Sequence, residues 1–370
     1  MPSTQAFFEI HKNNGGMWGF IFYNRKRAGL IVNPAGKEHQ LLSKINYHRD
    51  RTVGKMKPDT TSANRILSRK IRLCQSRICL LFLLGLILSA PPSISSGQDL
   101  TINLESLKSI SLDKLVIIDT RSKYKYLLGH IPNAIHLGKW QDFTQKIKGV
   151  RGVLIENPKF IVTKFNRYGI HPNKTIVIYG EPNDPWREDG RFFWMFERFG
   201  FDKVAIFEGG VKKWKSLGNR LEFGPAKEAA KSLLTPKDIR LNHGVAADQQ
   251  WIMKRLGSKT LSIIDNRTRD EYQGASPYGS PRGGHIPSAV HIHWPDFFLS
   301  NGHMKSKTEL LNILNQFNIT YGKEVVVYCT GGVRSAMAYF VLRHLGYKVR
   351  NYDGSWWDWS QNPKLPIELS

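Results

Sequence analysis

The sequence predicts an α/β protein with two tandem domains, each a mainly parallel sheet flanked by helices. Short apolar strands alternate with helical patterns along residues 98–370, an order that is typical of parallel sheets. The same series of motifs occurs twice in this region, which indicates an internal repeat of domain size. A chain of 370 residues is long enough for two such domains and a tail.

Four motifs carry the repeat. An apolar strand ends in Asp-x-Arg, Gly-His-Ile-Pro follows, a second apolar strand ends in Tyr, and an acidic residue with Gly precedes one or more Trp. In the first copy these motifs are Asp119-Thr120-Arg121, Gly129–Pro132, Thr175–Tyr179 and Glu208-Gly209-Gly210 with Trp214. In the second copy they are Asp265-Asn266-Arg267, Gly284–Pro287, Val325–Tyr328 and Asp353-Gly354-Ser355 with Trp356 and Trp359. We therefore expect domains at 98–222 and 249–370, joined by a linker at 223–248.

The individual elements follow from residue type and period. β-Branched runs predict strands at 115–119, 175–179, 204–207, 261–265 and 325–328. Helices are expected at 153–169, at 192–199, around Trp214, and from near Ser335 to Gly346.

One loop, Cys329–Arg334, carries the predicted chemistry. A cysteine between a strand and a helix lies near backbone N–H groups and the positive end of the helix dipole, which favour the nucleophilic thiolate. The glycines of this loop let several N–H groups point inward toward an anion. The predicted anion-binding residues are Thr330, Gly331, Gly332, Val333, Arg334 and Ser335, and Arg282 is expected to face the same pocket. The alternative is a small apolar cysteine at a strand end, and the first copy has Gly180 at this position.

Composition narrows the class of protein. The net charge is +24, and residues 98–370 alone contribute +13, which favours anionic ligands. No nucleic-acid module is recognisable, so a small anion is favoured over nucleic acid. Of the three cysteines only Cys329 lies in the body, which argues against a disulfide framework or a zinc site of paired cysteines. His291 and His293 alternate beside a strand, a weak metal pattern, so no metal or cofactor is expected.

The N-terminal region differs from the body. Residues 1–77 are basic and without period, and we expect them to be disordered or to begin with an upstream extension, residues 1–55, before a start at Met56. A basic lead, the apolar run 78–90 and the small-residue exit 91–97 are typical of an export signal, which predicts a periplasmic protein. An uncleaved membrane anchor at 78–90 or a buried helix are the alternatives.

At these motifs the chain resembles the rhodanese (thiosulfate sulfurtransferase) family in its tandem two-domain form, over about residues 100–370. The resemblance implies that Cys329 is catalytic and carries a sulfane sulfur as a persulfide. The implied partners are a small anionic sulfur donor and a thiophilic acceptor, which is cyanide, a thiol or a thiol protein.

Loop length and composition bear on the substrate. The loops of cysteine phosphatases of similar fold resemble the pattern Cys-x5-Arg, whereas Cys329 and Arg334 form the shorter Cys-x4-Arg. The shorter loop favours a sulfur group over a phosphate ester as the bound substrate. Small residues at Thr330-Gly331 resemble the mercaptopyruvate type, whereas a cation at Arg334 suits the thiosulfate dianion. Thiosulfate is the expected donor, with 3-mercaptopyruvate or a protein persulfide as alternatives. A non-enzymatic persulfide carrier also stays open.

Several residues have expected supporting roles. Asp265 and Arg267 should form an ion pair or cap at a strand end, as should their counterparts in the first copy. His285 should fix a turn by hydrogen bonding. Trp356, Trp357 and Trp359 should lie in the core and the pocket wall.

Overall fold

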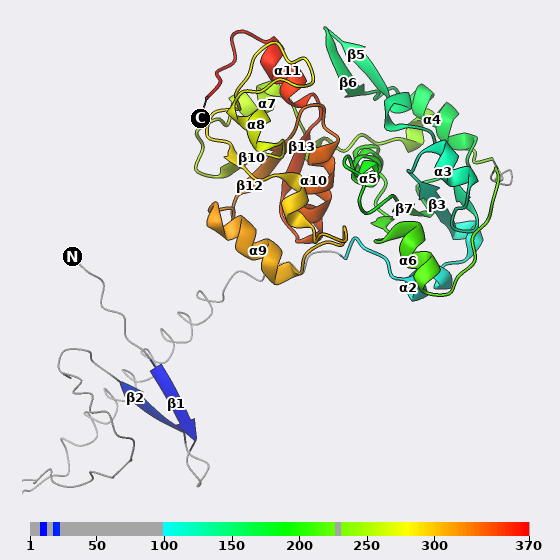
Figure 1. Cartoon of the computed structure of the whole chain (residues 1–370), viewed down its shortest axis with the longest axis horizontal. Coiled ribbons are helices and arrows are strands. Elements are labelled where there is room, and N and C mark those ends of the chain that lie inside the picture. Colours follow the sequence, from blue (N-terminus) through cyan, green and yellow to red (C-terminus); the bar gives the residue numbers. More distant parts are fainter. Residues whose placement is uncertain (1–7, 13–17, 23–98, 226–230, 370) are drawn as a thin grey trace, which may run out of the picture. The chain divides into compact units, whose positions relative to one another are not determined.

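The computed structural model describes residues 8–12, 18–22, 99–225 and 231–369 (Figure 1). The chain divides into two units, 1–89 and 90–370, and each is described by itself. In the first unit, strands β1 (Phe8–Lys12) and β2 (Trp18–Phe22) pair antiparallel. The expected export signal at 78–97 and the rest of residues 1–77 lie outside the described residues.

The first domain of the second unit is built on a parallel sheet of order β4-β3-β7-β8. Its strands are β3 (Leu115–Asp119), β4 (Ala134–Ile135), β7 (Thr175–Tyr179) and β8 (Val204–Ile206). All five residues of β3 are buried, because helices cover both faces of a parallel sheet and leave no polar side. A separate antiparallel hairpin joins β5 (Thr144–Ile147) to β6 (Val150–Leu154).

The second domain repeats this plan with one more strand. Its parallel sheet has the order β11-β10-β12-β13-β9. The strands are β9 (Ala246–Ala247), β10 (Leu261–Asp265), β11 (Val290–His291), β12 (Glu324–Tyr328) and β13 (Val349–Tyr352). The predicted fold of two tandem parallel-sheet domains is therefore confirmed.

Helices flank both sheets. Those of the first domain are α2 (Leu104–Ser109), α3 (Lys123–Leu127), α4 (Pro158–Asn166), α5 (Glu188–Arg198) and α6 (Gly210–Ser216). Those of the second are α7 (Gln249–Met253), α8 (Arg269–Gln273), α9 (Lys307–Gln316), α10 (Arg334–His344) and α11 (Ser355–Gln361). Short 3-10 helices are η1 (Leu112–Lys114), η2 (Trp140–Phe143), η3 (Pro236–Asp238), η4 (His243–Val245) and η5 (Trp294–Phe297). Among the described residues, none of the helices is both long and apolar enough to cross a bilayer.

The expected helix at 153–169 is wrong in its extent. Residues 150–154 form β6, and α4 begins only after the N-cap Asn157, whose side chain accepts hydrogen bonds from the N–H groups of Lys159 and Phe160. Pro158 occupies the first helical position, where a missing N–H costs nothing. The apolar residues of the hairpin imitated a helical period at this point.

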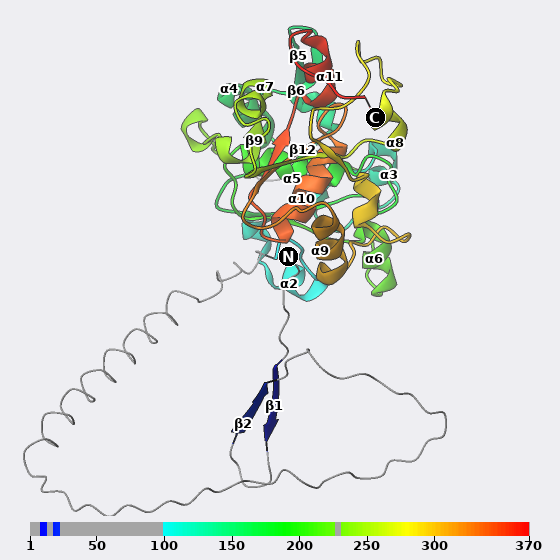
Figure 2. The ribbon, with the colours of Figure 1, turned by 90° about the vertical axis from the view of Figure 1, so that its left-hand side faces the viewer.

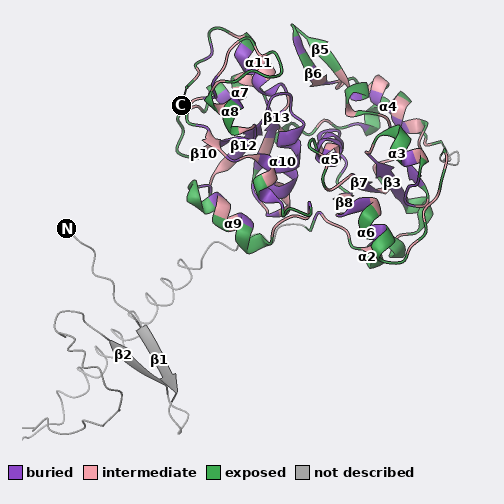
Figure 3. Cartoon of the chain, viewed as in Figure 1, coloured by how far each residue is buried: buried purple, intermediate pink, exposed green. Residues whose placement is uncertain are grey.

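The two domains pack through α5 and α10, which are among the most buried helices (Figures 1, 2 and 3). Phe193 of α5 and Phe340 of α10 contact edge to face, with ring centroids 5.0 Å apart. Gly190 allows the closest approach, since a Cβ built there would lie 2.5 Å from the Met337 Cα. Helix α10 begins at the end of the Cys329–Arg334 loop, so this packing connects the first domain to the predicted site.

Candidate active site

Cys329 lies at the end of β12, where the chain turns into α10. Its side chain is buried, with a residue exposure of 1%. The first turn of α11 lies against the loop, because the N–H groups of Trp356 and Trp357 donate to the carbonyls of Cys329 and Thr330. The N–H of Cys329 itself donates to Ser355 Oγ at 3.2 Å. The loop backbone is therefore held from a third element as well as from its own strand and helix.

The surroundings of Cys329 favour the thiolate. Burial raises the pKa of the thiol, but the positive charge of Arg334 and hydrogen bonds from Ser335 and the Gly331 backbone outweigh it and lower the pKa. Ser335 Oγ lies 3.6 Å from Sγ and 2.6 Å from Asn351 Oδ1. A lowered pKa increases the fraction of the nucleophilic thiolate, which reduces the need for a separate general base.

Glycine is required at positions 331 and 332 because neighbouring atoms approach the backbone closely there. Gly332 has φ +76°, and a Cβ there would lie 2.5 Å from the Asp353 carbonyl oxygen. At Gly331 an added Cβ would contact the Trp357 ring more closely than any real side chain does. Val333, the N-cap residue of α10, is buried beside them. The predicted loop residues are thus brought together around Cys329.

Arg334 does not extend freely toward an incoming anion. Its Nη1 and Nη2 donate to the two carboxylate oxygens of Glu271, at 2.7 and 2.8 Å. Thr330 Oγ1 accepts from Arg334 Nη2 and donates to Glu271 Oε1, both at 2.6 Å. Arg334, Glu271 and Thr330 are all buried, so this cation is paired inside the protein while its charge still acts on Cys329.

The structure places Arg282 elsewhere. Its guanidinium donates to the carbonyl oxygens of Ser360, Leu365, Trp359 and Asn362, and so holds the end of α11 and the segment that follows it. Four main-chain acceptors are satisfied by this one side chain. A role for Arg282 in binding substrate stays a prediction that these bonds do not support.

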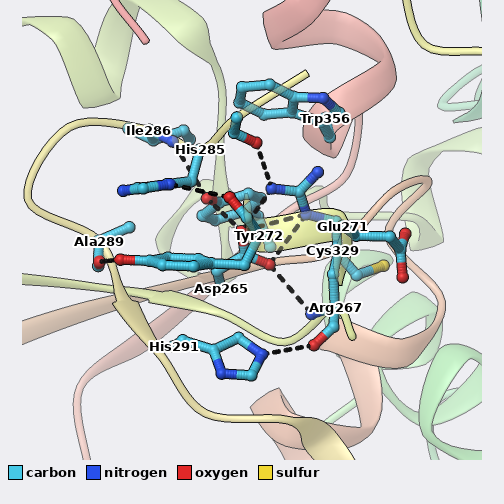
Figure 4. A network of polar contacts seen from close by, with 12 residues as sticks. Asp265, Arg267, Glu271, Tyr272, His285, Ile286, Ala289, His291, Cys329 and Trp356 are labelled. Atoms are coloured by element: carbon cyan, nitrogen blue, oxygen red, sulfur yellow. Dashed lines mark hydrogen bonds and ion pairs between the residues drawn. The ribbon is translucent and has the colours of Figure 1, made fainter. Parts of the chain in front are cut away.

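Asp265 and Arg267 form the predicted ion pair, which belongs to the polar network drawn with Cys329 in Figure 4. Arg267 Nη2 is 2.6 Å from Asp265 Oδ2 and also donates to the Gly284 carbonyl. Tyr328 OH donates to Asp265 Oδ2 at 2.6 Å and accepts from the Ile286 N–H. This network joins the ends of β10 and β12 to the Gly-His-Ile-Pro turn.

The first copy contains the same network without a cysteine. Asp119, Arg121 and Tyr179 repeat these bonds, with Arg121 Nη2 also donating to the Gly129 carbonyl. His130 and His285 each bond through Nδ1 to a main-chain carbonyl and stack on a tyrosine, as expected for residues that fix a turn. Since the network persists where no nucleophile exists, its task is to build the scaffold.

The position of the nucleophile is filled differently in the first copy. A Cβ added at Gly180 would lie 3.0 Å from Thr120 Oγ1 and 3.1 Å from Asp189 Cγ. The Asp189 carboxylate is itself buried in an ion pair with Arg187 at 2.9 Å. The first copy therefore has a packed ion pair where the second has a thiol.

Sequence reasoning missed three kinds of residue at this site. Glu271 is 63 positions from Arg334, and its only sequence signal is the capping box that it forms with Thr268. Arg191 of the first domain reaches the Gly332 carbonyl at 3.2 Å and pairs with Asp353 at 2.6 Å. The rings of Trp186 and Tyr278 contact each other and lie near Arg334, and no sequence pattern brings these two residues together.

Comparison with known proteins agrees with this architecture. Residues 103–217 and 248–362 each match the rhodanese-like domain. Thiosulfate sulfurtransferase of Corynebacterium glutamicum is 31% identical over 271 residues, which cover 68% of this chain and 84% of the relative. A Thermus thermophilus protein named sulfur carrier protein TtuD is 32% identical over 260 residues, covering 65% of this chain and 86% of its own.

A solved structure, SseA from Escherichia coli, is described as showing the rhodanese fold of 3-mercaptopyruvate sulfotransferases. It has a TM-score of 0.61 at 24% identity, over 70% of this chain and 99% of its own. At this level of sequence identity, the similarity to SseA is evidence for a shared fold alone. The two domain matches together cover more than half of the chain, which therefore belongs to the rhodanese family and is a sulfurtransferase of its tandem form.

Proposed function

We propose that this protein moves a sulfane sulfur from an anionic donor to a thiophilic acceptor through a persulfide on Cys329. One observation carries the proposal: the sole cysteine of the described residues is buried in a strand–loop–helix turn that lowers its pKa. A thiolate held by backbone N–H donors and the positive charge of Arg334 is suited to form and keep a persulfide, whose charge needs the same groups.

The reaction with thiosulfate has two displacement steps. The Cys329 thiolate attacks the outer sulfur of thiosulfate, a new S–S bond forms, and sulfite leaves with the electron pair of the broken S–S bond. The acceptor then attacks the terminal sulfur of the persulfide. With cyanide the product is thiocyanate, and the Cys329 thiolate is released unchanged.

The relatives named thiosulfate sulfurtransferase support thiosulfate as the donor. A second donor, 3-mercaptopyruvate, is supported by a specific observation. Arg334, the loop cation that should favour a dianion, is neutralised by Glu271. A donor with a single negative charge therefore loses less at this site than a dianion does.

The test is cyanide-dependent thiocyanate formation with each donor, for the native protein and for Cys329→Ser. We expect turnover by the native protein and only background by the variant, at unchanged folded content by circular dichroism. Equal rates for the two proteins would contradict the role of Cys329.

A carrier role is supported by the relative named sulfur carrier protein. A carrier would take up sulfur from a donor and release it only to a protein thiol. A persulfide on Cys329 that is stable to cyanide, together with transfer to a protein thiol, would favour this role over free turnover.

We propose further that the protein is exported to the periplasm. The support is the order of the basic lead, the apolar run 78–90 and the small-residue segment 91–97. N-terminal sequencing of the native protein after cell fractionation tests this proposal. A start within or just after 91–97 in the periplasmic fraction supports it, whereas intact protein in the cytoplasmic fraction would contradict it.

A further inference from the structure

Glu271 is the carboxylate that faces the catalytic loop from α8. It accepts hydrogen bonds from both terminal nitrogens of Arg334 and from the hydroxyl of Thr330. It therefore contacts Thr330, which follows Cys329, and Arg334, which begins α10. Its Oε2 also accepts from the Thr268 N–H and hydroxyl, at 3.1 and 3.0 Å. The carboxylate is thus fixed in position by its own helix before it contacts the loop.

Two aromatic rings, which contact each other edge to face with centroids 5.8 Å apart, lie on one side of the Arg334 guanidinium. The Trp186 ring of the first domain and the Tyr278 ring of the second have centroids 5.7 and 5.5 Å from its central carbon. Both distances lie within the usual cation–π range. The ion pair with Glu271 and the two neighbouring rings together hold this cation in one place, and Glu271 supplies the compensating charge.

A comparison with the first copy supports a specific role for Glu271. Lys125 occupies the position of Glu271 and Glu181 that of Thr330, and their side chains pair at 3.1 Å. The contact between the first turn of the helix and the loop is therefore common to both copies. Only the catalytic copy places a carboxylate on the helix and a cation on the loop.

Resting on the proposed function, we propose that Glu271 is a positioning residue that limits how much of the Arg334 charge reaches Cys329 and an incoming donor. By doing so it sets the preference of the site between singly and doubly charged donors. Without this carboxylate the paired cation would become an uncompensated one at the same place.

Other charged groups face this region and have to be distinguished from Glu271. Two of them are His293 before η5 and Tyr278 in the loop after α8. The others are the Arg191–Asp353 pair at Gly332, Arg151 over the Trp357 ring, and the Asp265–Arg267–Tyr328 network. Burial lowers the pKa of His293. Asp353 and Asp265 each have their own arginine.

The experiment measures alkylation of Cys329 by iodoacetamide against pH, with the peptide identified by mass so that Cys74 and Cys79 do not contribute. In Glu271→Gln we expect the midpoint to fall by about one pH unit, because a buried negative charge is removed near the thiolate. The ratio of the KM for thiosulfate to that for 3-mercaptopyruvate should fall about tenfold. Simple loosening of the loop would release Arg334 and move the midpoint upward instead.

The matched control is Lys125→Gln in the first copy, for which we expect no change in the midpoint. The same change is also made in Arg334→Gln, where it should no longer lower the midpoint, because the charge that Glu271 compensates is absent. An unchanged or raised midpoint in Glu271→Gln, or a further fall when the change is added to Arg334→Gln, overturns the proposal, and the second comparison applies even if Glu271→Gln alone does not fold. Alkylation needs no turnover, so failure of the proposed sulfur transfer would be seen separately in the thiocyanate assay.

Discussion

At the residue scale, the pKa of Cys329 is set by one charged neighbour and a few hydrogen-bond donors and not by burial alone. The thiol is buried, and burial alone would raise its pKa, yet Arg334, Ser335 and the Gly331 backbone reverse the direction. The same reversal occurs at Glu271. Burial raises the pKa of its carboxyl, but hydrogen bonds and charge from Arg334 lower it to about 2.

This depressed pKa predicts an acid-sensitive contribution to stability. The folded pKa of about 2 lies below the ordinary carboxyl value of 4.5, so the contribution is fully present above about pH 4.5 and is lost as pH falls toward 2. We expect the free energy of unfolding of Glu271→Gln to be lower than native by about 3 kcal/mol at pH 7, with the two converging near pH 2. Urea unfolding across this pH range measures the difference. A constant gap at all pH values would contradict the assignment.

At the element scale, one strand–loop–helix unit occurs twice with different contents. In the second copy β12 leads through glycines to α10, and the loop encloses a thiol. In the first copy β7 leads to α5, and the buried Arg187–Asp189 pair occupies the corresponding space. The scaffold network of Asp, Arg and Tyr is the same in both, so the difference between the copies lies in the loop and in the residues that contact it.

It follows that a cysteine at Gly180 should not restore a second site. Its Cβ would lie against Thr120 and Asp189, and the neighbouring Asp189 carboxylate opposes a thiolate. In the double variant Gly180→Cys/Cys329→Ser we expect no thiocyanate formation above background. Turnover by this variant would show that the surrounding loop matters less than the thiol itself.

The elements differ in how well the sequence predicts them. Strands such as Leu115–Asp119 and Glu324–Tyr328 were predictable because β-branched runs between helices leave few other structures. The extent of α4 was not, because the apolar spacing of the β5–β6 hairpin overlaps a helical period. The partner of Arg334 and the orientation of Arg282 were also out of reach, since both depend on contacts between residues more than 60 positions apart.

At the scale of the whole catalytic unit, the first domain contributes to a site whose nucleophile lies in the second. Helix α5 packs on α10, and Glu197 of α5 pairs with Arg343 of α10 at 2.8 Å. Arg191 reaches the catalytic loop from α5, and Trp186 lies over Arg334. The copy without a nucleophile therefore serves as a wall and support for the copy that has one.

Gly190→Ala tests this packing. In a free helix alanine would stabilise by about 1 kcal/mol, but here its Cβ would collide with the Met337 backbone. We expect the free energy of unfolding to fall by about 1–3 kcal/mol, measured by urea titration. The control is Gly322→Ala, where no atom lies within 4 Å of the added Cβ and little change is expected. Equal effects of the two substitutions would argue against close packing at α5 and α10.

The central claim is that Cys329 carries the transferred sulfur. The most direct measurement is the mass of the Cys329 peptide after brief exposure of the native protein to thiosulfate or 3-mercaptopyruvate. We predict a gain of one sulfur atom on this peptide, with its loss and the release of thiocyanate on addition of cyanide. An unmodified Cys329 peptide in a protein that still forms thiocyanate would contradict the account.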